Sequence, residues 1–174
     1  MSTHLLIVWH SATGASEQLA QAALQAASAQ IDAATPELAP RCLHCQQAGP
    51  DDLLQAGGYL FICPENLATM AGLMKDFFDR CYYPVLGRIE GRPYASIISA
   101  GSDGHGAATQ LARIATGWRL KAVAEPLIVM VNAQTPAGRN LSRPPTAVLR
   151  WPQVWQWAFT EACCLAQSPA RRQS

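Results

Sequence analysis

The sequence is poor in charged residues and contains no block of charge of one sign. Charged residues make up 14% of the 174 positions, and the formal net charge is +1. Surfaces that bind nucleic acid concentrate lysine and arginine, so this composition argues against a nucleic-acid partner. No apolar run reaches the roughly 18 residues that a membrane-spanning helix needs, so we expect no membrane insertion.

The N-terminus lacks the features of a secretion signal. Residues 1–4 lead directly into an apolar β-type segment, with no basic region, long apolar region or cleavage site. The six cysteines of such a chain are expected to be free thiols and not a disulfide framework. From these features we expect a cytoplasmic protein.

Metal-binding patterns are also sparse. Cys42 and Cys45 form a CxxC, but no second pair follows, and His44 within the spacing does not complete a zinc site. The alternative to a redox or metal role is one thiol on a short strand and another in a loop. The sequence therefore predicts no metal site.

Several runs rich in Ile, Leu and Val show no alternation with polar residues. Continuous apolarity indicates strands that are buried on both faces, as in a parallel sheet covered by helices. The runs lie at residues 4–9, 59–63, 95–100 and 127–131, with a weaker strand near residues 41–43.

Helical patterns separate these runs, most clearly over residues 70–81, where apolar side chains recur every three or four positions. The alternation of strand and helix predicts right-handed βαβ crossovers and a doubly wound sheet, with ligand at the carboxyl ends of the strands. We expect a single domain over residues 1–167 and a flexible tail over residues 168–174. The other helices are expected at residues 16–30, 51–56 and 107–118 and from Pro152 onward, after a long loop at residues 132–150.

A loop with phosphate-binding character follows the first run. Its hydroxyls and the free N–H groups of the following helix can converge on a phosphate, and its glycine allows close approach of the backbone. There is no lysine, and the spacing is neither the Walker pattern nor GxGxxG, which argues against ATP and a Rossmann dinucleotide site. The alternative is that a serine only caps the helix. The residues are Ser11, Thr13, Gly14, Ala15 and Ser16.

Two further loops follow the strands expected at residues 59–63 and 95–100. The first leads into a helix that carries Lys75, Asp79 and Arg80, a set that is equally consistent with an ion-paired helix face. The second has glycines that let the backbone pass close to a flat ligand. The loop residues are Pro64, Glu65, Asn66, Leu67, Ala68 and Thr69, then Ala100, Gly101, Ser102, Asp103 and Gly104.

Together the three loops resemble the FMN site of the flavodoxin-like superfamily, in the branch of NAD(P)H-dependent FMN reductases and NAD(P)H:quinone reductases. The resemblance covers roughly residues 5–131, with the loops in the same order and on the same elements. It implies an α/β, flavodoxin-like, doubly wound five-stranded parallel sheet of order 2-1-3-4-5 with helices on both faces. It also implies an FMN phosphate at the first loop, the flavin ring along the other two, and NADH or NADPH as electron donor.

Two positions need separate comment. Related loops often place an aromatic residue against the flavin ring, whereas this loop has Asn66 and Leu67, so the ring is held less tightly or stacked from elsewhere. His105 is a candidate proton donor, because histidine can exchange a proton near neutral pH, although an exposed loop histidine needs no special role. His10 is a second candidate, for contact with the phosphate.

Three functions are consistent with the sequence. The leading one is an FMN oxidoreductase that uses NADH or NADPH to reduce a quinone or a similar small acceptor by two electrons. The second is a flavodoxin-type electron carrier, against which the net charge of +1 counts, since such carriers are typically acidic. The third is a non-catalytic interaction protein that uses its tryptophans. The resemblance implies a homo-oligomer, because related reductases commonly build their site between subunits.

Overall fold

The computed structural model describes residues 4–29 and 39–131. Four of the predicted features lie outside these ranges: the loop at residues 132–150, the helix from Pro152, the tail at residues 168–174 and the domain boundary at residue 167.

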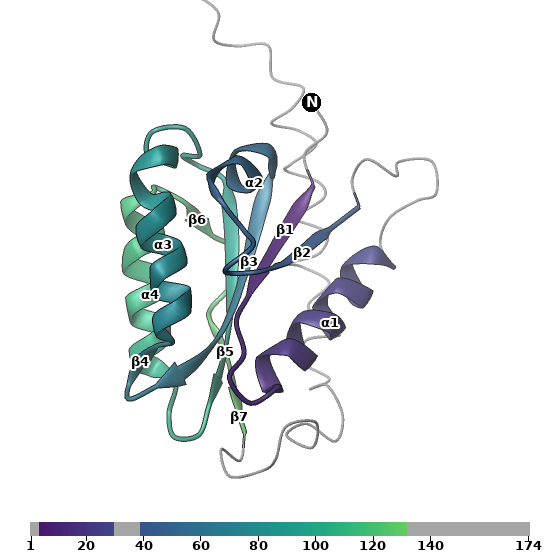
Figure 1. Cartoon of the computed structure of the whole chain (residues 1–174), viewed down its shortest axis with the longest axis vertical. Coiled ribbons are helices and arrows are strands. Elements are labelled where there is room, and N and C mark those ends of the chain that lie inside the picture. Colours follow the sequence, from purple (N-terminus) through teal and green to yellow (C-terminus); the bar gives the residue numbers. More distant parts are fainter. Residues whose placement is uncertain (1–3, 30–38, 132–174) are drawn as a thin grey trace, which may run out of the picture.

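A parallel sheet forms the centre of the molecule (Figure 1). Its strands run in the order β2-β1-β3-β5-β6, and β7 also pairs with β5. Counted as one interrupted strand, β6 and β7 are the fifth, so the predicted order 2-1-3-4-5 is confirmed. The bounds are β1 Leu5–Trp9, β2 Arg41–His44, β3 Gly58–Asn66, β5 Pro93–Ala100, β6 Lys121–Ala122 and β7 Leu127–Met130.

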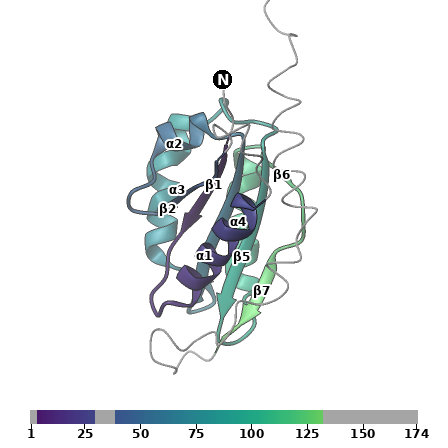
Figure 2. The ribbon, with the colours of Figure 1, turned by 90° about the vertical axis from the view of Figure 1, so that its right-hand side faces the viewer.

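The fifth strand is interrupted along β5 (Figure 2). β6 pairs with Pro93 and Tyr94, whereas β7 pairs with β5 from Ile97 onward. Pro126 directly precedes β7 and has no N–H to donate to the ladder. The break therefore occurs where the backbone loses a donor.

Helices cover both faces of the sheet, as predicted (Figure 1). α1 packs on one face against β1, β3 and β5, while the other three helices pack on the opposite face. The short helix hinted at by residues 51–56 is present, and Pro84 lies in the last turn of α3, which ends one residue later. The bounds are α1 Ala15–Ser28, α2 Pro50–Gln55, α3 Gly72–Val85 and α4 His105–Gly117.

The two faces differ in the size of their core side chains. On the α3 face, the ring of Phe61 lies 5.1 Å from that of Phe78, and Trp118 is fully buried with its Nε1–H donating to the Tyr82 carbonyl. Burial of each such ring contributes roughly 1.5–3 kcal/mol. α1 instead presents alanines to the sheet, such as Ala20 and Ala23 at 0% exposure. The small side chains let α1 lie close to the strands.

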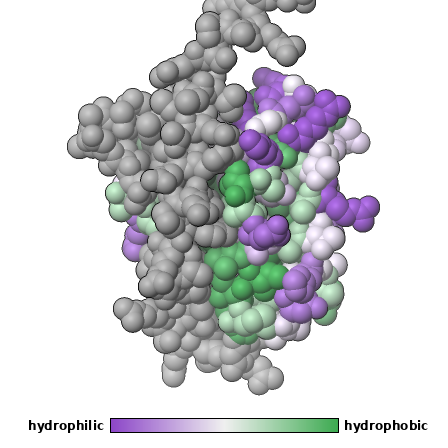
Figure 3. Space-filling model, turned by 180° about the vertical axis from the view of Figure 1, so that it is seen from behind, coloured by the Kyte–Doolittle hydropathy of each residue, from purple (hydrophilic) through white to green (hydrophobic). Residues whose placement is uncertain are grey.

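Some apolar side chains remain on the surface of the described residues. From behind, Figure 3 shows a hydrophobic area low on the face, next to the atoms drawn in grey. The large exposed apolar residues are Leu67, Leu73, Tyr83, Leu86 and Met130. None of the helices within residues 4–29 and 39–131 has the length and apolarity that crossing a bilayer requires.

Candidate functional site

The three predicted loops meet at one edge of the sheet, at the carboxyl ends of β1, β3 and β5 (Figure 1). Parallel strands bring this about, because their carboxyl ends all point the same way. We describe the segments in chain order as the 11–16, 64–70 and 101–107 segments.

The 11–16 segment forms a tight turn into α1. Gly14 has a φ of 94° at the N-cap of α1, a conformation that a residue with a Cβ adopts only at a cost. The Gly14 N–H donates to the Ser11 hydroxyl at 2.9 Å, so Ser11 closes the turn. The N-cap of α1 is this glycine, which has no side chain to accept from the first-turn N–H groups. Backbone N–H groups at the start of a helix suit an anion.

Ser16 connects the first segment to the centre of the sheet. Its hydroxyl lies 2.8 Å from that of Ser99, the last residue but one of β5, and both side chains are buried. Ser16 can therefore offer a phosphate its backbone N–H, while its hydroxyl is engaged in the core. Thr13 and Gly14 lie toward the surface.

The 64–70 segment is a β-hairpin, where the sequence suggested an open loop. β3 continues to Asn66 and pairs antiparallel with β4, Thr69–Met70. The turn between them consists of Leu67 and Ala68, with φ of 51° and 62°. Such two-residue turns normally use Asn-Gly, and a positive φ in another residue costs roughly 1–3 kcal/mol.

The strained turn also exposes a large apolar side chain. Leu67 is 100% exposed at the hairpin tip. Strain and exposed apolar surface both cost stability, and backbone strain concentrates at ligand-binding positions. The combination marks the tip as a candidate contact for a flat apolar ligand.

Glu65 ties the hairpin to the 101–107 segment. Its carboxylate accepts backbone N–H bonds from Gly104 and Ala107, both at 3.1 Å, and lies 3.5 Å from the Ser102 hydroxyl. Gly104 is the N-cap of α4, with a φ of 76°. A carboxylate from β3 thus caps α4, where negative charge is favoured.

The hairpin makes two further contacts with α4. The Ala68 carbonyl oxygen lies so close to Gly106 that a Cβ on Gly106 would be 1.9 Å from it. The Met70 N–H donates to Oε1 of Gln110 at 3.0 Å. Gly106 and Gln110 were not among the predicted site residues, because only the docked hairpin reveals their role.

His105 is the first residue of α4 and lies between two surface pockets. One, of about 640 Å³, is also lined by Arg113 and Glu125, and the other, of about 580 Å³, by Lys75 and Thr69. Asp103 accepts the His105 backbone N–H at 3.0 Å. The side chain is therefore placed beside the hairpin, at the same edge as the three segments.

The charged residues of α3 form the ion-paired helix face that the sequence allowed. Lys75 pairs with Asp79, and Arg80 pairs with Asp76 at 2.8 Å. Arg80 also donates to the Cys45 carbonyl at 2.9 Å. It thereby connects α3 to the chain that follows β2.

The two cysteines of the CxxC lie on opposite faces of the sheet. Cys42 packs with the α1-face cluster, and Cys45 is fully buried in the cluster on the α3 face. Burial raises the pKa of Cys42 to about 11, that of Cys81 to about 11 and that of Cys63 to about 12. These three thiols stay protonated at neutral pH, and none of the four cysteines in the described residues forms a disulfide.

Comparison with known proteins relates this arrangement to flavoproteins. A family model described as NADPH-dependent FMN reductase matches residues 5–135. No curated protein matches the sequence. The flavodoxin-like fold agrees with both the sheet order and the family match.

Solved structures share the fold at low sequence identity. Flavodoxin 1 from Bacillus cereus has 16% identity and a TM-score of 0.68, covering 88% of this chain and 97% of its own. A flavodoxin, WrbA-like protein from Agrobacterium tumefaciens has 13% identity and a TM-score of 0.64, covering 95% of this chain and 99% of its own. Rubredoxin oxygen:oxidoreductase from Desulfovibrio gigas has 15% identity and a TM-score of 0.61. That match covers 95% of this chain but only 37% of that protein.

Proposed function

Because the chain belongs to the NADPH-dependent FMN reductase family, we propose that it is an FMN-binding oxidoreductase that takes two electrons from NADH or NADPH and passes them to a quinone or a similar small acceptor. The observation that carries the proposal is the meeting of the three segments at one sheet edge, next to the N-terminus of α1, whose N-cap is a glycine. When bound, FMN carries the electrons, and the protein supplies binding, orientation and electrostatics.

The 11–16 segment is suited to the FMN phosphate. The first turn of α1 offers backbone N–H groups and the positive end of the helix dipole. We expect Ala15 and Ser16 to bind through their N–H groups, with Thr13 adding its hydroxyl. Ser11 supports them by holding Gly14 in its turn.

The hairpin and the 101–107 segment are suited to the flavin ring. We expect the backbone of residues 64–69 and 100–104 to lie along the ring, with Leu67 against its apolar face. Glu65 fixes the distance between the two segments through its bonds to Gly104 and Ala107. We expect these two segments to form the walls of a slot for the flavin ring, held together by the Glu65 carboxylate.

Proton transfer is assigned to His105. Its position at the start of α4, where it lines two pockets of which one adjoins the hairpin, supports a role in giving a proton to the reduced acceptor. The pockets are large enough for a small planar acceptor, and Lys75 and Arg113 line one of them. Cationic side chains at that place suit an anionic donor such as a nicotinamide nucleotide.

An absorption titration with FMN, followed by anaerobic addition of NADH or NADPH, tests the proposal. We expect saturable FMN binding and bleaching of the bound flavin by one of the nucleotides, with reoxidation by added quinone. Flavin that binds but is reduced only by dithionite would instead indicate an electron carrier. Absence of FMN binding would reject both and leave a protein–protein interaction role.

A further inference from the structure

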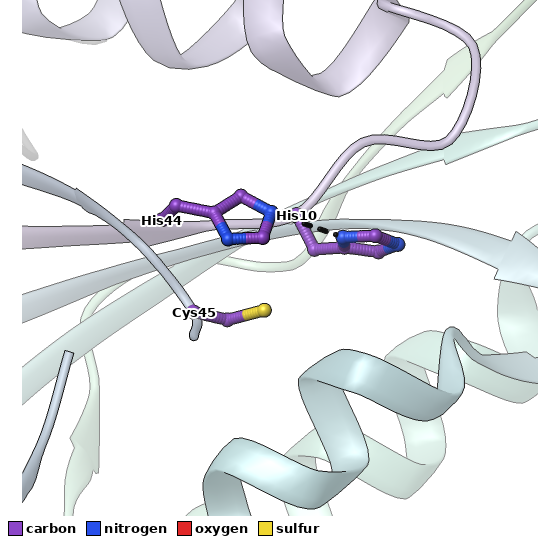
Figure 4. A group of neighbouring side chains, drawn as sticks. All are labelled: His10, His44 and Cys45. Carbon is purple, nitrogen blue, oxygen red and sulfur yellow. Dashed lines mark hydrogen bonds between the residues drawn. The ribbon is translucent and has the colours of Figure 1, made fainter. Parts of the chain in front are cut away.

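The carboxyl ends of β1 and β2 bring together three side chains that carry good metal-ligand atoms (Figure 4). His10 directly follows β1, and His44 and Cys45 lie at the end of β2. The strand register aligns them, because Trp9 pairs with His44 and the Cys45 N–H donates to the Trp9 carbonyl at 2.8 Å. The ligand atoms of the three side chains all lie within 4.8 Å of one another.

We propose that His10, His44 and Cys45 form a binding site for one Zn²⁺ ion, with a fourth position open to water or another ligand. Two imidazoles and one thiolate are the nitrogen and sulfur donors that Zn²⁺ prefers over the oxygen ligands of Mg²⁺ and Ca²⁺. Three protein ligands and one open position are the arrangement of zinc sites that bind an exchangeable ligand.

The spacing of the two histidines agrees with tetrahedral zinc. Nδ1 of His10 lies 3.3 Å from Nε2 of His44. Two nitrogens that are each about 2.0–2.1 Å from a tetrahedral Zn²⁺ lie about 3.4 Å apart. The two histidine nitrogens are thus already at the separation that the ion requires.

The surroundings of the site are compatible with an added cation. Arg80 donates to the Cys45 carbonyl, but Asp76 pairs with its guanidinium at 2.8 Å and offsets the positive charge. The Gln46 N–H donates to Nδ1 of His44 at 3.4 Å, which is longer than an ordinary hydrogen bond. Coordination through Nε2 of His44 and Nδ1 of His10 replaces the hydrogen bond between the two rings, and a proton on Nδ1 of His44 gives up the long contact from Gln46.

The site differs from the one that a CxxC would suggest. Cys42 packs on the α1 face of the sheet, so it cannot share an ion with Cys45 on the α3 face. The third ligand comes instead from His10, 34 positions before His44 in the sequence. His10 is also a candidate for contact with the FMN phosphate, and its ring packs against that of His44.

Titration of the full-length, flavin-free protein with Co²⁺ tests the proposal, because Co²⁺ reports its ligands by absorption. We expect one equivalent to bind with a thiolate charge-transfer band and the strong visible bands of tetrahedral Co²⁺, and Zn²⁺ to displace it. Cys45→Ser should abolish the charge-transfer band. Cys42→Ser is the matched control and should keep it, since Cys42 faces the other side of the sheet.

Removal of either histidine should weaken the site strongly. Loss of an outer hydrogen-bond partner alone costs 10–100-fold in metal affinity, so His10→Ala and His44→Ala are each expected to cost at least about 100-fold. X-ray absorption of the Zn²⁺-loaded native protein avoids variants and should give one sulfur at about 2.3 Å and two nitrogens at about 2.0–2.1 Å.

Two results would overturn the inference. One is a charge-transfer band that persists in Cys45→Ser, and the other is a zinc environment without sulfur. Because the Co²⁺ titration uses flavin-free protein and X-ray absorption reports only the zinc ligands, their outcome is independent of whether the chain binds FMN or reacts with NADPH.

Discussion

The backbone N–H of Ala107 donates a hydrogen bond to Oε2 of Glu65 at 3.1 Å, which joins the first turn of α4 to the end of β3. The same carboxylate accepts from the Gly104 N–H. One side chain therefore satisfies two helix-end donors and positions the hairpin against the 101–107 segment. This makes Glu65 a positioning residue for the expected flavin slot.

Replacing Glu65 should loosen that slot. Glu65→Ala leaves the two N–H groups without their acceptor, and loss of a helix cap costs about 0.5–2 kcal/mol. We expect this loss of unfolding free energy in denaturant melts, together with weaker FMN binding. Glu90→Ala is the control, since Glu90 pairs with the exposed Arg119 and the variant should change stability by less than about 1 kcal/mol. Equal effects of the two variants would contradict the capping role.

Gly106 should not tolerate a side chain. In Gly106→Ala the new Cβ would fall 1.9 Å from the Ala68 carbonyl oxygen, so the hairpin must move away from α4. We expect a destabilisation of about 1–3 kcal/mol and reduced FMN affinity. Gly72→Ala is the matched control, because nothing lies within 4 Å of its Cβ position. That variant should be neutral or stabilising by about 0.4–1 kcal/mol.

The turn at Leu67 and Ala68 offers a test that separates stability from function. Asn-Gly is the sequence that such a turn prefers, so the double variant Leu67→Asn with Ala68→Gly should raise the free energy of unfolding by about 1 kcal/mol or more. If Leu67 contacts the flavin ring, FMN affinity should fall in the same variant. Unchanged affinity in the more stable protein would remove Leu67 from the site.

Removal of two hydroxyl groups tests whether the 11–16 segment binds the FMN phosphate. Ser11→Ala with Thr13→Ala removes the support of Gly14 and an expected phosphate contact, and should lower FMN affinity by at least about tenfold, equivalent to about 1.4 kcal/mol. Riboflavin, which lacks the phosphate, should bind the variant and the native protein alike. A parallel loss of riboflavin affinity would show that the variant has lost more than the phosphate contact.

His4 should make stability depend on pH. It is buried, its Nε2 has no hydrogen-bond partner among the described residues, and burial followed by the charge of Arg41 lowers its pKa. The unfolded chain then binds the extra proton more readily as the pH falls below about 6.5, so the free energy of unfolding decreases on acidification toward the lowered pKa.

Unfolding melts of His4→Leu between about pH 7 and pH 5 check this effect. The variant should lose less stability over that range than the native protein. Part of the slope should remain, because burial and the neighbouring His44 also lower the pKa of His10. An identical slope in both proteins would exclude His4 as a source of the pH dependence.

The layout of strands and helices could be predicted from the sequence because it depends on local patterns. Unbroken apolar runs indicated strands buried on both faces, and the spacing of Met74, Phe77, Phe78 and Cys81 indicated the buried face of α3. Glycine at residue 14 likewise indicated the turn that begins α1. Each of these signals is contained in about a dozen neighbouring residues.

The details of the site depended on partners far apart in the sequence. Glu65 and Ala107 are 42 positions apart, and His10 and His44 are 34 apart, so each pair meets only through the tertiary fold. The hairpin was missed because Leu67 and Ala68 are not residues that favour a positive φ. Docking on α4 holds them in that conformation despite their local preference.

The hydrogen bond between Ser16 and Ser99 joins the first turn of α1 to the end of β5. Since α1 meets the sheet through small alanine side chains, it has little room to shift without moving this contact. Binding of an anion to the backbone N–H groups of α1 should therefore also affect the end of β5, where the 101–107 segment begins. The amide resonances of Ser99 and Ala100 should accordingly respond to inorganic phosphate alone, before any flavin ring is present.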